Sequence, residues 1–404
     1  MKYDFTTIWD RVGRDAIAVD GVGKAPGSTY VPTEPKEGFD LIPMWIADMN
    51  FATSPHVVDS IKERLDHPLF GYYPIKDEYY DTIINWQTKR NNFKDLKKEY
   101  IGFENGVHGG ITSAVQILSE PGDKILLHKP TYNGFVHDVE EIGRHSVYSE
   151  LKKDEDGIYR MDYEEMDRLI KENNIRLAIF CSPHNPSGRV WEKEELEKAA
   201  KVFEENNCYV ICDEIWADLV YSGSEHTPFV CLNDWTKERV VGMYAPTKTF
   251  NLAGVYGSYH IIYDEELREK ITKYGAKTHY NSLHILSMYA LLGAYSQESE
   301  EWVDELLKVL EENLSYATDF INKEIDGVEV TMPEGTYMLF IDVSSYMDKT
   351  GKTLEEVVES GWDYGVAWAN GNHYNGPANI RLNLALPLER VKEACVRMKE
   401  YIFV

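Results

Sequence analysis

Lys248 is the residue of this chain with the most specific chemical potential. Lysine is the one side chain that forms a reversible imine with an aldehyde cofactor, and burial lowers the pKa of its amine so that it can also act as a base. Taken alone, Lys248 would be assigned to the surface, because most lysines are exposed. Residues 182–188, 212–215 and 380–384 carry the groups that such a lysine needs around it, and they reverse that assignment.

Asp213 follows the apolar run 208–212, which has the length and composition of a buried strand. A carboxylate at the C-terminal end of a strand lies where open α/β sheets bind ligands. There it could keep a pyridine nitrogen protonated, and the charged ring would be an electron sink for a carbanion at a substrate Cα. The alternative, a helix cap or a turn, would be preferred if Lys248 were absent.

Asn185 and Arg381 are candidates for contacts with cofactor and substrate. Asn185 lies in a proline-flanked loop after the strand predicted for residues 176–181, so we expect its amide at the same sheet edge as Asp213, within reach of a cofactor's phenolic oxygen. Arg381 lies on a short apolar strand, where its planar guanidinium could hold an amino acid carboxylate by two parallel hydrogen bonds. From spacing alone, a structural salt bridge of Arg381 is an equally good interpretation.

Residues 106–111, Gly-Val-His-Gly-Gly-Ile, join a strand predicted for residues 100–104 to a helix predicted for residues 112–118. Exposed backbone amides at a helix start suit a phosphate group. A single glycine-rich turn is weak evidence for phosphate, because most such turns simply make a tight connection.

Short apolar runs alternate with amphipathic segments from about residue 100 onward. This alternation predicts a largely parallel sheet covered by helices. The runs expected to form buried strands are residues 124–128, 176–181, 208–212 and 239–244.

The C-terminal third of the chain has a different pattern. Residues 284–322 have apolar side chains at helical spacing and predict long helices that leave the sheet. Alternating residues then predict half-buried strands at 337–343 and 378–384 and a closing helix at 388–401, which indicates a smaller α+β unit. The expected division is residues 1–50 as the N-terminal part of the small domain, 51–285 as the large domain and 286–404 as the C-terminal part of the small domain. The Gly- and Pro-rich residues 21–38 are expected to form a surface loop.

The composition excludes several classes of function. Lys and Arg total 42 against 68 Asp and Glu, and the net charge of −26 repels nucleic acid backbones and anionic lipid surfaces alike. No uncharged run approaches the roughly 18 residues of a membrane span, and the N-terminus lacks the pattern of a secretory signal. Five cysteines without paired spacing indicate reduced thiols and no metal site. We therefore expect a cytoplasmic protein that binds neither nucleic acid nor membrane.

The chain resembles the fold type I pyridoxal phosphate enzymes, which are the aspartate aminotransferase superfamily of class I and II. Within that superfamily it is most similar to the MalY/PatB branch of cystathionine beta-lyases, which includes cystalysin. The resemblance covers nearly the whole chain and implies an α/β fold with a mostly parallel seven-stranded sheet sandwiched by helices, plus a smaller α+β domain from both termini. The segments that carry it are residues 3–7, 47–49, 70–72, 182–191, 213–215, 248–251, 334–337 and 381–385.

By this resemblance the cofactor is pyridoxal 5'-phosphate and Lys248 forms the Schiff base with it. Asp213 pairs with the pyridine nitrogen, Asn185 contacts the phenolic oxygen and Tyr132 stacks on the ring. Arg381 binds the substrate carboxylate.

The remaining implied contacts hold the cofactor phosphate. The amides of Val107 and His108 and the hydroxyl of Thr247 would bind it, and Tyr72 would reach the phosphate of a neighbouring subunit. A homodimer with shared active sites follows from the family.

Several positions depart from the family pattern. Trp216, a candidate substrate contact, stands where the branch usually has His after Asp-Glu-Ile, and Asn133 replaces a second aromatic residue after Tyr132. The sequence at 108–110, His-Gly-Gly, replaces a more apolar one, and residues 368–376 are unlike the usual glycine-rich segment before the arginine strand. These departures alter the pocket more than the cofactor anchors.

The branch implies a carbon-sulfur beta-lyase that acts on cystathionine or another S-substituted cysteine. Once the Cα proton is removed, a thiolate whose free pKa is about 8.5 can leave Cβ, and pyruvate and ammonia follow. An aminotransferase is the main alternative, because every anchor named above serves both reactions. A racemase, which needs a proton donor on the opposite ring face, and a non-catalytic regulator that binds a transcription factor, as some members of the branch do, are lesser alternatives.

Overall fold

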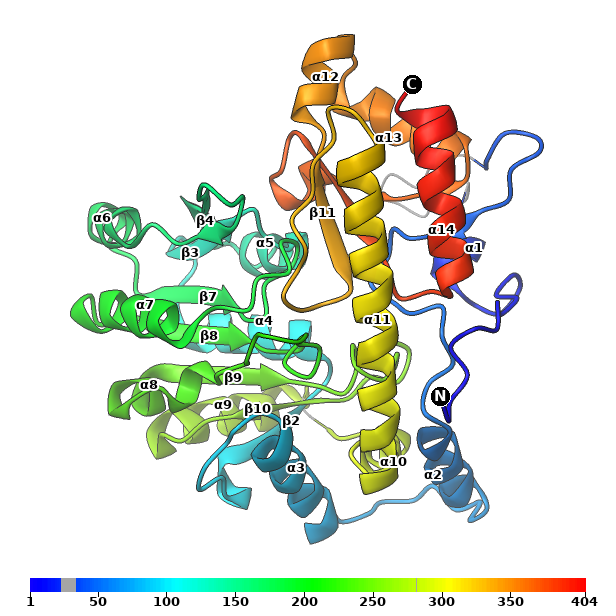
Figure 1. The fold of residues 1–404 in the computed structure, drawn as a ribbon. Coiled ribbons are helices and arrows are strands. Elements are labelled where there is room, and N and C mark those ends of the chain that lie inside the picture. Colours follow the sequence, from blue (N-terminus) through cyan, green and yellow to red (C-terminus); the bar gives the residue numbers. More distant parts are fainter. Residues whose placement is uncertain (23–33, 281) are drawn as a thin grey trace.

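The computed structural model describes residues 1–22, 34–280 and 282–404 (Figure 1). Most of the surface loop predicted at residues 21–38 therefore lies outside the described residues. A seven-stranded sheet in the order β2-β10-β9-β8-β7-β3-β4 forms the centre. Its β10 is antiparallel to both neighbours, and the other neighbouring strands are parallel, as the sequence predicts. The strands are β2 Ile101–Glu104, β3 Lys124–Lys129, β4 His145–Glu150, β7 Leu177–Cys181, β8 Tyr209–Asp213, β9 Val240–Tyr244 and β10 Ser258–Ile261.

Both faces of this sheet are buried by helices. Along β7, Leu177 and Ile179 pack into one apolar cluster, while Ala178 and Phe180 pack into another. This explains why the strand is continuously apolar, since both of its faces meet protein. One face is covered by α4 Val107–Leu118, α5 Asn133–Glu140 and α9 Glu265–Thr278. The cluster on the other face includes side chains of α3 Asp77–Arg90, α6 Tyr163–Asn173 and α7 Lys193–Glu205.

Two helices lead from the sheet to the C-terminal part where the sequence predicts long helices, and only the second of them is long. They are α10 Ile285–Ala294 and the 28-residue α11 Gln297–Glu324. α10 packs against α2 Pro55–Leu65, and α11 packs against α14 Leu388–Arg397, which ends in a π-helical turn (Figure 1).

The C-terminal part has its own antiparallel sheet in the order β11-β14-β13. The short β1 Ile42–Pro43 pairs in parallel with β12 Val366–Ala367, and Arg390 and Arg397 both form ion pairs with Asp40. These contacts tie the two ends of the chain together. The domain boundaries at residues 50 and 285 stay a prediction. The other elements of this part are β11 Met338–Asp342, β13 Ala369–Asn370, β14 Asn379–Asn383, α12 Ser344–Thr350 and α13 Leu354–Asp363.

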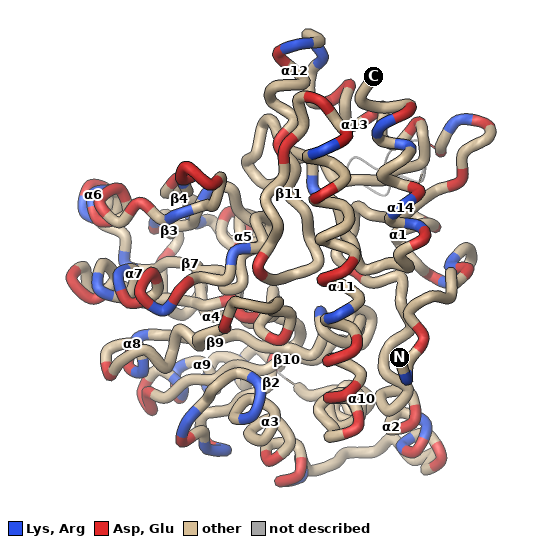
Figure 2. The backbone as a smooth tube through the Cα atoms, in the orientation of Figure 1, with Lys and Arg blue, Asp and Glu red and all other residues tan. Residues whose placement is uncertain are grey.

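Charged residues of both signs gather on the outer helices, while the central strands carry few of them (Figure 2). On α6 and α7 opposite charges pair one helical turn apart, as in Arg168 with Glu172 and Lys201 with Glu205. Such faces are typical of solvated helix surfaces. Among the described residues no helix is both long and apolar enough to cross a membrane.

Candidate active site

The loops that leave the C-terminal ends of β7, β8 and β9 meet the start of α4 around a cavity of about 310 Å³, here called the inner cavity. Parallel strands bring their carboxyl ends to one sheet edge, which is why segments far apart in sequence converge there. The predicted site residues that line the inner cavity are Val107, His108, Tyr132, Asn185, Asp213, Trp216, Thr247 and Lys248.

Lys248 lies in the loop after β9, and its Nζ donates a hydrogen bond to the carbonyl oxygen of Ala47 at 2.9 Å. The hydroxyl of Tyr337 donates to the same oxygen at 3.1 Å. Burial, helped by the Arg381 charge, lowers the pKa of the Lys248 amine to about 8. An amine with this pKa is partly neutral near neutral pH, so it can attack an aldehyde and later accept a proton.

Asp213 is the last residue of β8 and is 5% exposed. Its Oδ1 accepts a hydrogen bond from the backbone N–H of Ile215 at 3.0 Å. Burial raises the pKa of the carboxyl to about 6, against the Ile215 hydrogen bond and the charges of His108 and Lys248. A buried carboxylate of this kind favours a cationic partner in the cavity, and a protonated pyridine nitrogen fits that requirement.

The start of α4 offers the cavity unused backbone N–H groups. The helix begins at Val107, five residues earlier than the sequence predicts, because Gly106 adopts a φ of +81° and makes the turn. Its first intrahelical bond runs from Gly110 N to Gly106 O, and no side chain caps it. The N–H groups of residues 107–109 thus make no intrahelical bond and can bind an anion. Thr247 lines the same cavity.

Arg381, on β14, is a buried cation that has no carboxylate partner among the described residues. Its Nη1 donates to Asn185 Oδ1 at 3.0 Å and its Nη2 donates to Trp45 O at 3.1 Å, while Nε has no hydrogen-bond partner in the described chain. Its guanidinium lies 4.3 Å from the ring centre of Tyr374. The predicted alternative, a structural salt bridge, is therefore absent from the described residues. A buried, unpaired guanidinium favours an anionic ligand.

An outer cavity of about 470 Å³ adjoins the inner one and shares Ala47, Tyr132, Lys248 and Ala253 with it. Part of the unusual segment 368–376 lines the outer cavity, and so does Asn133, which begins α5 and contacts His137. The outer cavity therefore leads toward Lys248. Its other lining residues include Trp45, Trp362, Trp368, Asn370, His373, Tyr374 and Arg381.

Trp216 and Tyr72 stand at opposite extremes of burial. Trp216 is 2% exposed, packs edge-on against Tyr337 with ring centres 4.7 Å apart, and has Lys248 Nζ 5.5 Å from its ring centre. Tyr72 is fully exposed and lines neither cavity of the single chain. Its predicted contact with the phosphate of a neighbouring subunit stays a prediction.

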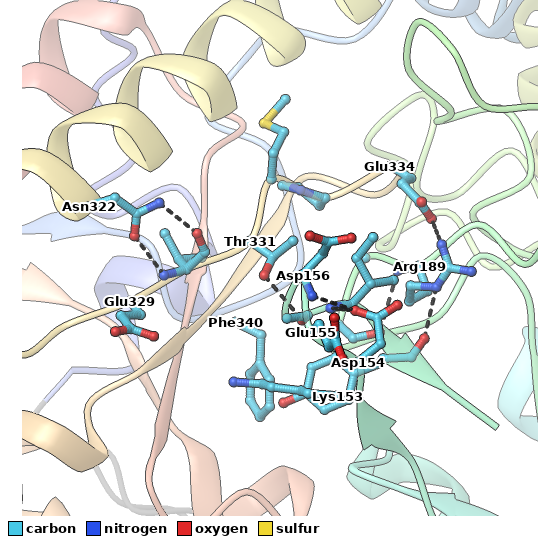
Figure 3. Close-up of a pocket in the computed structure, with 18 residues that line it drawn as sticks. Lys153, Asp154, Glu155, Asp156, Arg189, Asn322, Glu329, Thr331, Glu334 and Phe340 are labelled. Atoms are coloured by element: carbon cyan, nitrogen blue, oxygen red, sulfur yellow. Dashed lines mark hydrogen bonds and ion pairs between the residues drawn. The ribbon is translucent and has the colours of Figure 1, made fainter. Parts of the chain in front are cut away.

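A larger cavity, about 650 Å³, lies elsewhere, between the hairpin of β5 Lys152–Lys153 and β6 Tyr159–Arg160 and residues 329–334 (Figure 3). None of the predicted site residues lines it. Its Arg189 is fully engaged by protein groups, since it pairs with Glu334 and Glu195 and donates to Tyr159 O at 3.0 Å. This larger cavity therefore carries none of the chemistry described above.

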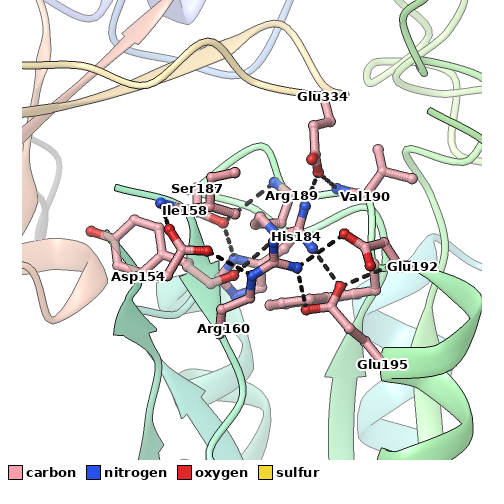
Figure 4. A network of polar contacts seen from close by, with 12 residues as sticks. Asp154, Ile158, Arg160, His184, Ser187, Arg189, Val190, Glu192, Glu195 and Glu334 are labelled. Atoms are coloured by element: carbon pink, nitrogen blue, oxygen red, sulfur yellow. Dashed lines mark hydrogen bonds and ion pairs between the residues drawn. The ribbon is translucent and has the colours of Figure 1, made fainter. Parts of the chain in front are cut away.

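The Arg189 network instead supports the loop that presents Asn185 (Figure 4). Glu334 also accepts from Val190 N at 2.9 Å, and Arg160 bonds Glu195 at 2.9 Å. These contacts tie the loop after β7 to the segment that enters β11. The position of Asn185 next to Arg381 is thus held from two parts of the chain.

Some functional groups could not be identified from sequence. The carbonyl oxygen of Ala47, which accepts a hydrogen bond from Lys248, belongs to the backbone, so the residue type does not reveal it. Asp138 is one of many acidic residues on helices. The side chain of His108 contacts Asp138 and Tyr132, whereas the sequence suggested only its backbone amide.

Comparison with known proteins gives consistent results. A family model described as aminotransferase class I and II matches residues 40–398. The chain is 33% identical over 400 residues to cystathionine beta-lyase PatB of Bacillus subtilis, covering 96% of this chain and 97% of the relative. A PLP-bound protein of Clostridium difficile 630, named as a proposed aminotransferase, is 33% identical with a TM-score of 0.90, covering 99% and 100% of the two chains. The PLP-bound C-S lyase of Staphylococcus hominis is 31% identical with a TM-score of 0.87, covering 98% of each chain.

Proposed function

We propose that this chain, which belongs to the aminotransferase class I and II family, is a pyridoxal 5'-phosphate-dependent carbon-sulfur beta-lyase. Its structure is that of the fold type I pyridoxal phosphate enzymes. The observation that carries the reaction type is full-length similarity to a cystathionine beta-lyase and a C-S lyase. The proposed substrate is cystathionine or another L-cysteine S-conjugate, which with one water gives a thiol, pyruvate and ammonia.

The residues of the inner cavity fit the cofactor. The unused N–H groups at the start of α4 and the Thr247 hydroxyl suit its phosphate, and the buried Asp213 suits its pyridine nitrogen. Lys248 would hold its aldehyde, and Tyr132 would lie against its ring. When bound, pyridoxal 5'-phosphate supplies the electron sink that makes the substrate Cα–H bond acidic.

The chain's own groups then orient the substrate and move its protons. Arg381 binds the substrate carboxylate with its two terminal nitrogens, beside Asn185. The neutral amine of Lys248 takes the Cα proton, which its lowered pKa permits. The Cβ–S bond then breaks with the electron pair on sulfur, and the thiolate leaves toward the outer cavity, which Tyr132 also lines.

The enzyme is also proposed to be a cytoplasmic homodimer with Tyr72 completing the partner's site. In the single chain Leu69 is 68% exposed, Phe70 54% and Tyr72 fully exposed. Neighbouring exposed apolar side chains of this kind are typical of an interface.

The reaction is tested with the holoenzyme and a panel of L-cysteine thioethers, with pyruvate measured by coupled NADH oxidation. A lyase forms pyruvate from at least one thioether, and Lys248→Ala abolishes that activity while Lys201→Ala, on the exposed face of α7, keeps it. Failure of the whole panel, together with amino-group transfer to a keto acid, would instead establish the aminotransferase alternative.

A further inference from the structure

The side chain of His108 is not used by any cofactor or substrate contact proposed above. Its ring lies at the start of α4, lines the inner cavity and is 49% exposed. His108 Nδ1 lies 2.7 Å from Asp138 Oδ2, and His108 Nε2 lies 3.2 Å from the hydroxyl oxygen of Tyr132. One imidazole therefore joins a buried carboxylate to the phenol that lines both cavities.

Two helices hold these groups in place. Asp138, on α5, is 9% exposed, and its Oδ1 also accepts from the Thr112 hydroxyl of α4 at 3.1 Å. A Cβ added at Gly134 would lie 2.2 Å from His108 Cε1 and 2.5 Å from Tyr132 Cε1. The first turn of α5 therefore leaves room for both rings only because residue 134 is glycine.

The contact with Asp138 determines which ring nitrogen of His108 carries a proton. An ionised carboxylate only accepts hydrogen bonds, so Nδ1 is the protonated nitrogen. Nε2 then accepts the phenol proton of Tyr132 when the ring is neutral, and donates to the phenol oxygen when the ring is charged. Carboxylate, imidazole and hydroxyl groups in this order move a proton in the serine hydrolase triad.

The charged groups around His108 set the pH at which this change occurs. Asp138 faces it from α5, Asp213 from β8 and Lys248 from the loop after β9. Burial and the Lys248 charge lower the His108 pKa, but the hydrogen bond and charge of Asp138, together with the Asp213 charge, outweigh them and raise it from its ordinary 6.5. The ring can therefore be protonated near neutral pH, and its side chain is 49% exposed in the single chain.

We propose that His108 and Asp138 form a relay that orients the Tyr132 hydroxyl and returns a proton to it. The inference rests on the proposed lyase function for the use of that proton. When the Cβ–S bond breaks, the thiolate sulfur takes the proton of the Tyr132 O–H bond. The phenolate oxygen then takes the proton from His108 Nε2, and His108 regains one from solvent. Both relay side chains act through Tyr132 and are positioning residues.

Steady-state kinetics of single and double variants of the holoenzyme test the relay, because the losses of kcat from two residues that act together do not add. His108→Gln should lower kcat by about tenfold or more with KM within about threefold, because acid–base groups contribute at least that much. One ionisation near neutral pH, that of His108, should be lost from the pH profile of kcat in this variant. The double variant His108→Gln/Tyr132→Phe should be no slower than Tyr132→Phe alone, within about twofold. His145→Gln, an exposed position at the start of β4, is the control.

If the change His108→Gln lowers kcat by the same factor in the Tyr132→Phe background as in the wild type, the relay is overturned. His108 would then act independently of the phenol. An unchanged pH profile in His108→Gln would overturn it as well.

A second measurement needs no turnover. In holoenzyme with 13C-labelled histidines, the His108 resonance, identified by its loss in His108→Gln, should titrate above pH 6.5 in the wild type. It should move to lower pH in the isosteric variant Asp138→Asn, which removes the largest favourable charge. If the enzyme forms pyruvate but the His108 resonance titrates at the same pH in Asp138→Asn as in the wild type, the relay is overturned. The predicted titration without pyruvate from any thioether would support the relay and refute the lyase.

Discussion

Replacing Arg381 by alanine should weaken substrate binding while the protein still folds. Arg381 is 2% exposed and has no carboxylate partner in the described chain, so its charge is free for a ligand. Truncating one side of a desolvated charge pair costs about 2 to 5 kcal/mol. At about 1.4 kcal/mol per factor of ten, kcat/KM for a cysteine thioether should fall by roughly 30-fold to several thousand-fold. The loss should be mainly in KM, because the carboxylate is bound in both ground and transition states.

The assay is steady-state pyruvate release, with cofactor content and Tm measured in parallel. Arg381→Lys keeps the charge but loses the two-pronged geometry, so its kcat/KM should lie between those of Arg381→Ala and the wild type. Arg168→Ala, on the exposed surface of α6, is the matched control and should behave as wild type. A KM within about twofold of wild type for Arg381→Ala, at full cofactor content, would refute the assignment of Arg381 to the carboxylate.

Three further predictions concern the cofactor anchors. Without cofactor, Lys248→Met should have a higher free energy of unfolding than the wild-type protein at pH 7, measured by chemical denaturation. The difference should shrink as pH rises from 8 toward 10.5, because the folded chain holds the Lys248 proton less tightly than the unfolded chain does. A difference that does not change with pH would contradict this. Asp213→Asn should lower kcat by about 10²-fold or more, because the pyridine nitrogen loses its carboxylate, and kcat within about threefold would argue against that pairing. Gly109→Ala should weaken cofactor binding measured by equilibrium dialysis, because the added Cβ would lie 1.9 Å from the Tyr280 hydroxyl oxygen, so that the Tyr280 ring or the start of α4 must shift beside the phosphate site; unchanged affinity would show that the shift does not reach that site.

The site residues that directly follow buried parallel strands could be located from the sequence. The apolar runs before Asp213 and Asn185 are continuous because both faces of the sheet are covered, and their ends could be located from the run alone. β4 and β10 escaped prediction for different reasons. β4 lies at the edge of the sheet and carries polar residues, so it lacks the continuous apolar run of a buried strand. β10 is antiparallel and has only four residues, too few to give a clear pattern.

The rest of the site depends on tertiary contacts that leave no trace in one sequence. The bond from Lys248 to the Ala47 carbonyl joins residues 201 positions apart. That Arg381 has no carboxylate partner among the described residues can be seen only when its neighbours are placed in three dimensions. The early start of α4 was missed because two glycines at 109 and 110 lower helix propensity, which tertiary packing overrides.

The most direct test of the central claim is to count pyruvate formed from L-cystathionine against enzyme equivalents, with the holoenzyme and no added keto acid. A beta-lyase predicts pyruvate in large excess over enzyme, with thiol and ammonia in equal amounts. One equivalent of keto product per site, with the reaction stopping until a keto acid is added, would contradict the lyase and establish an aminotransferase.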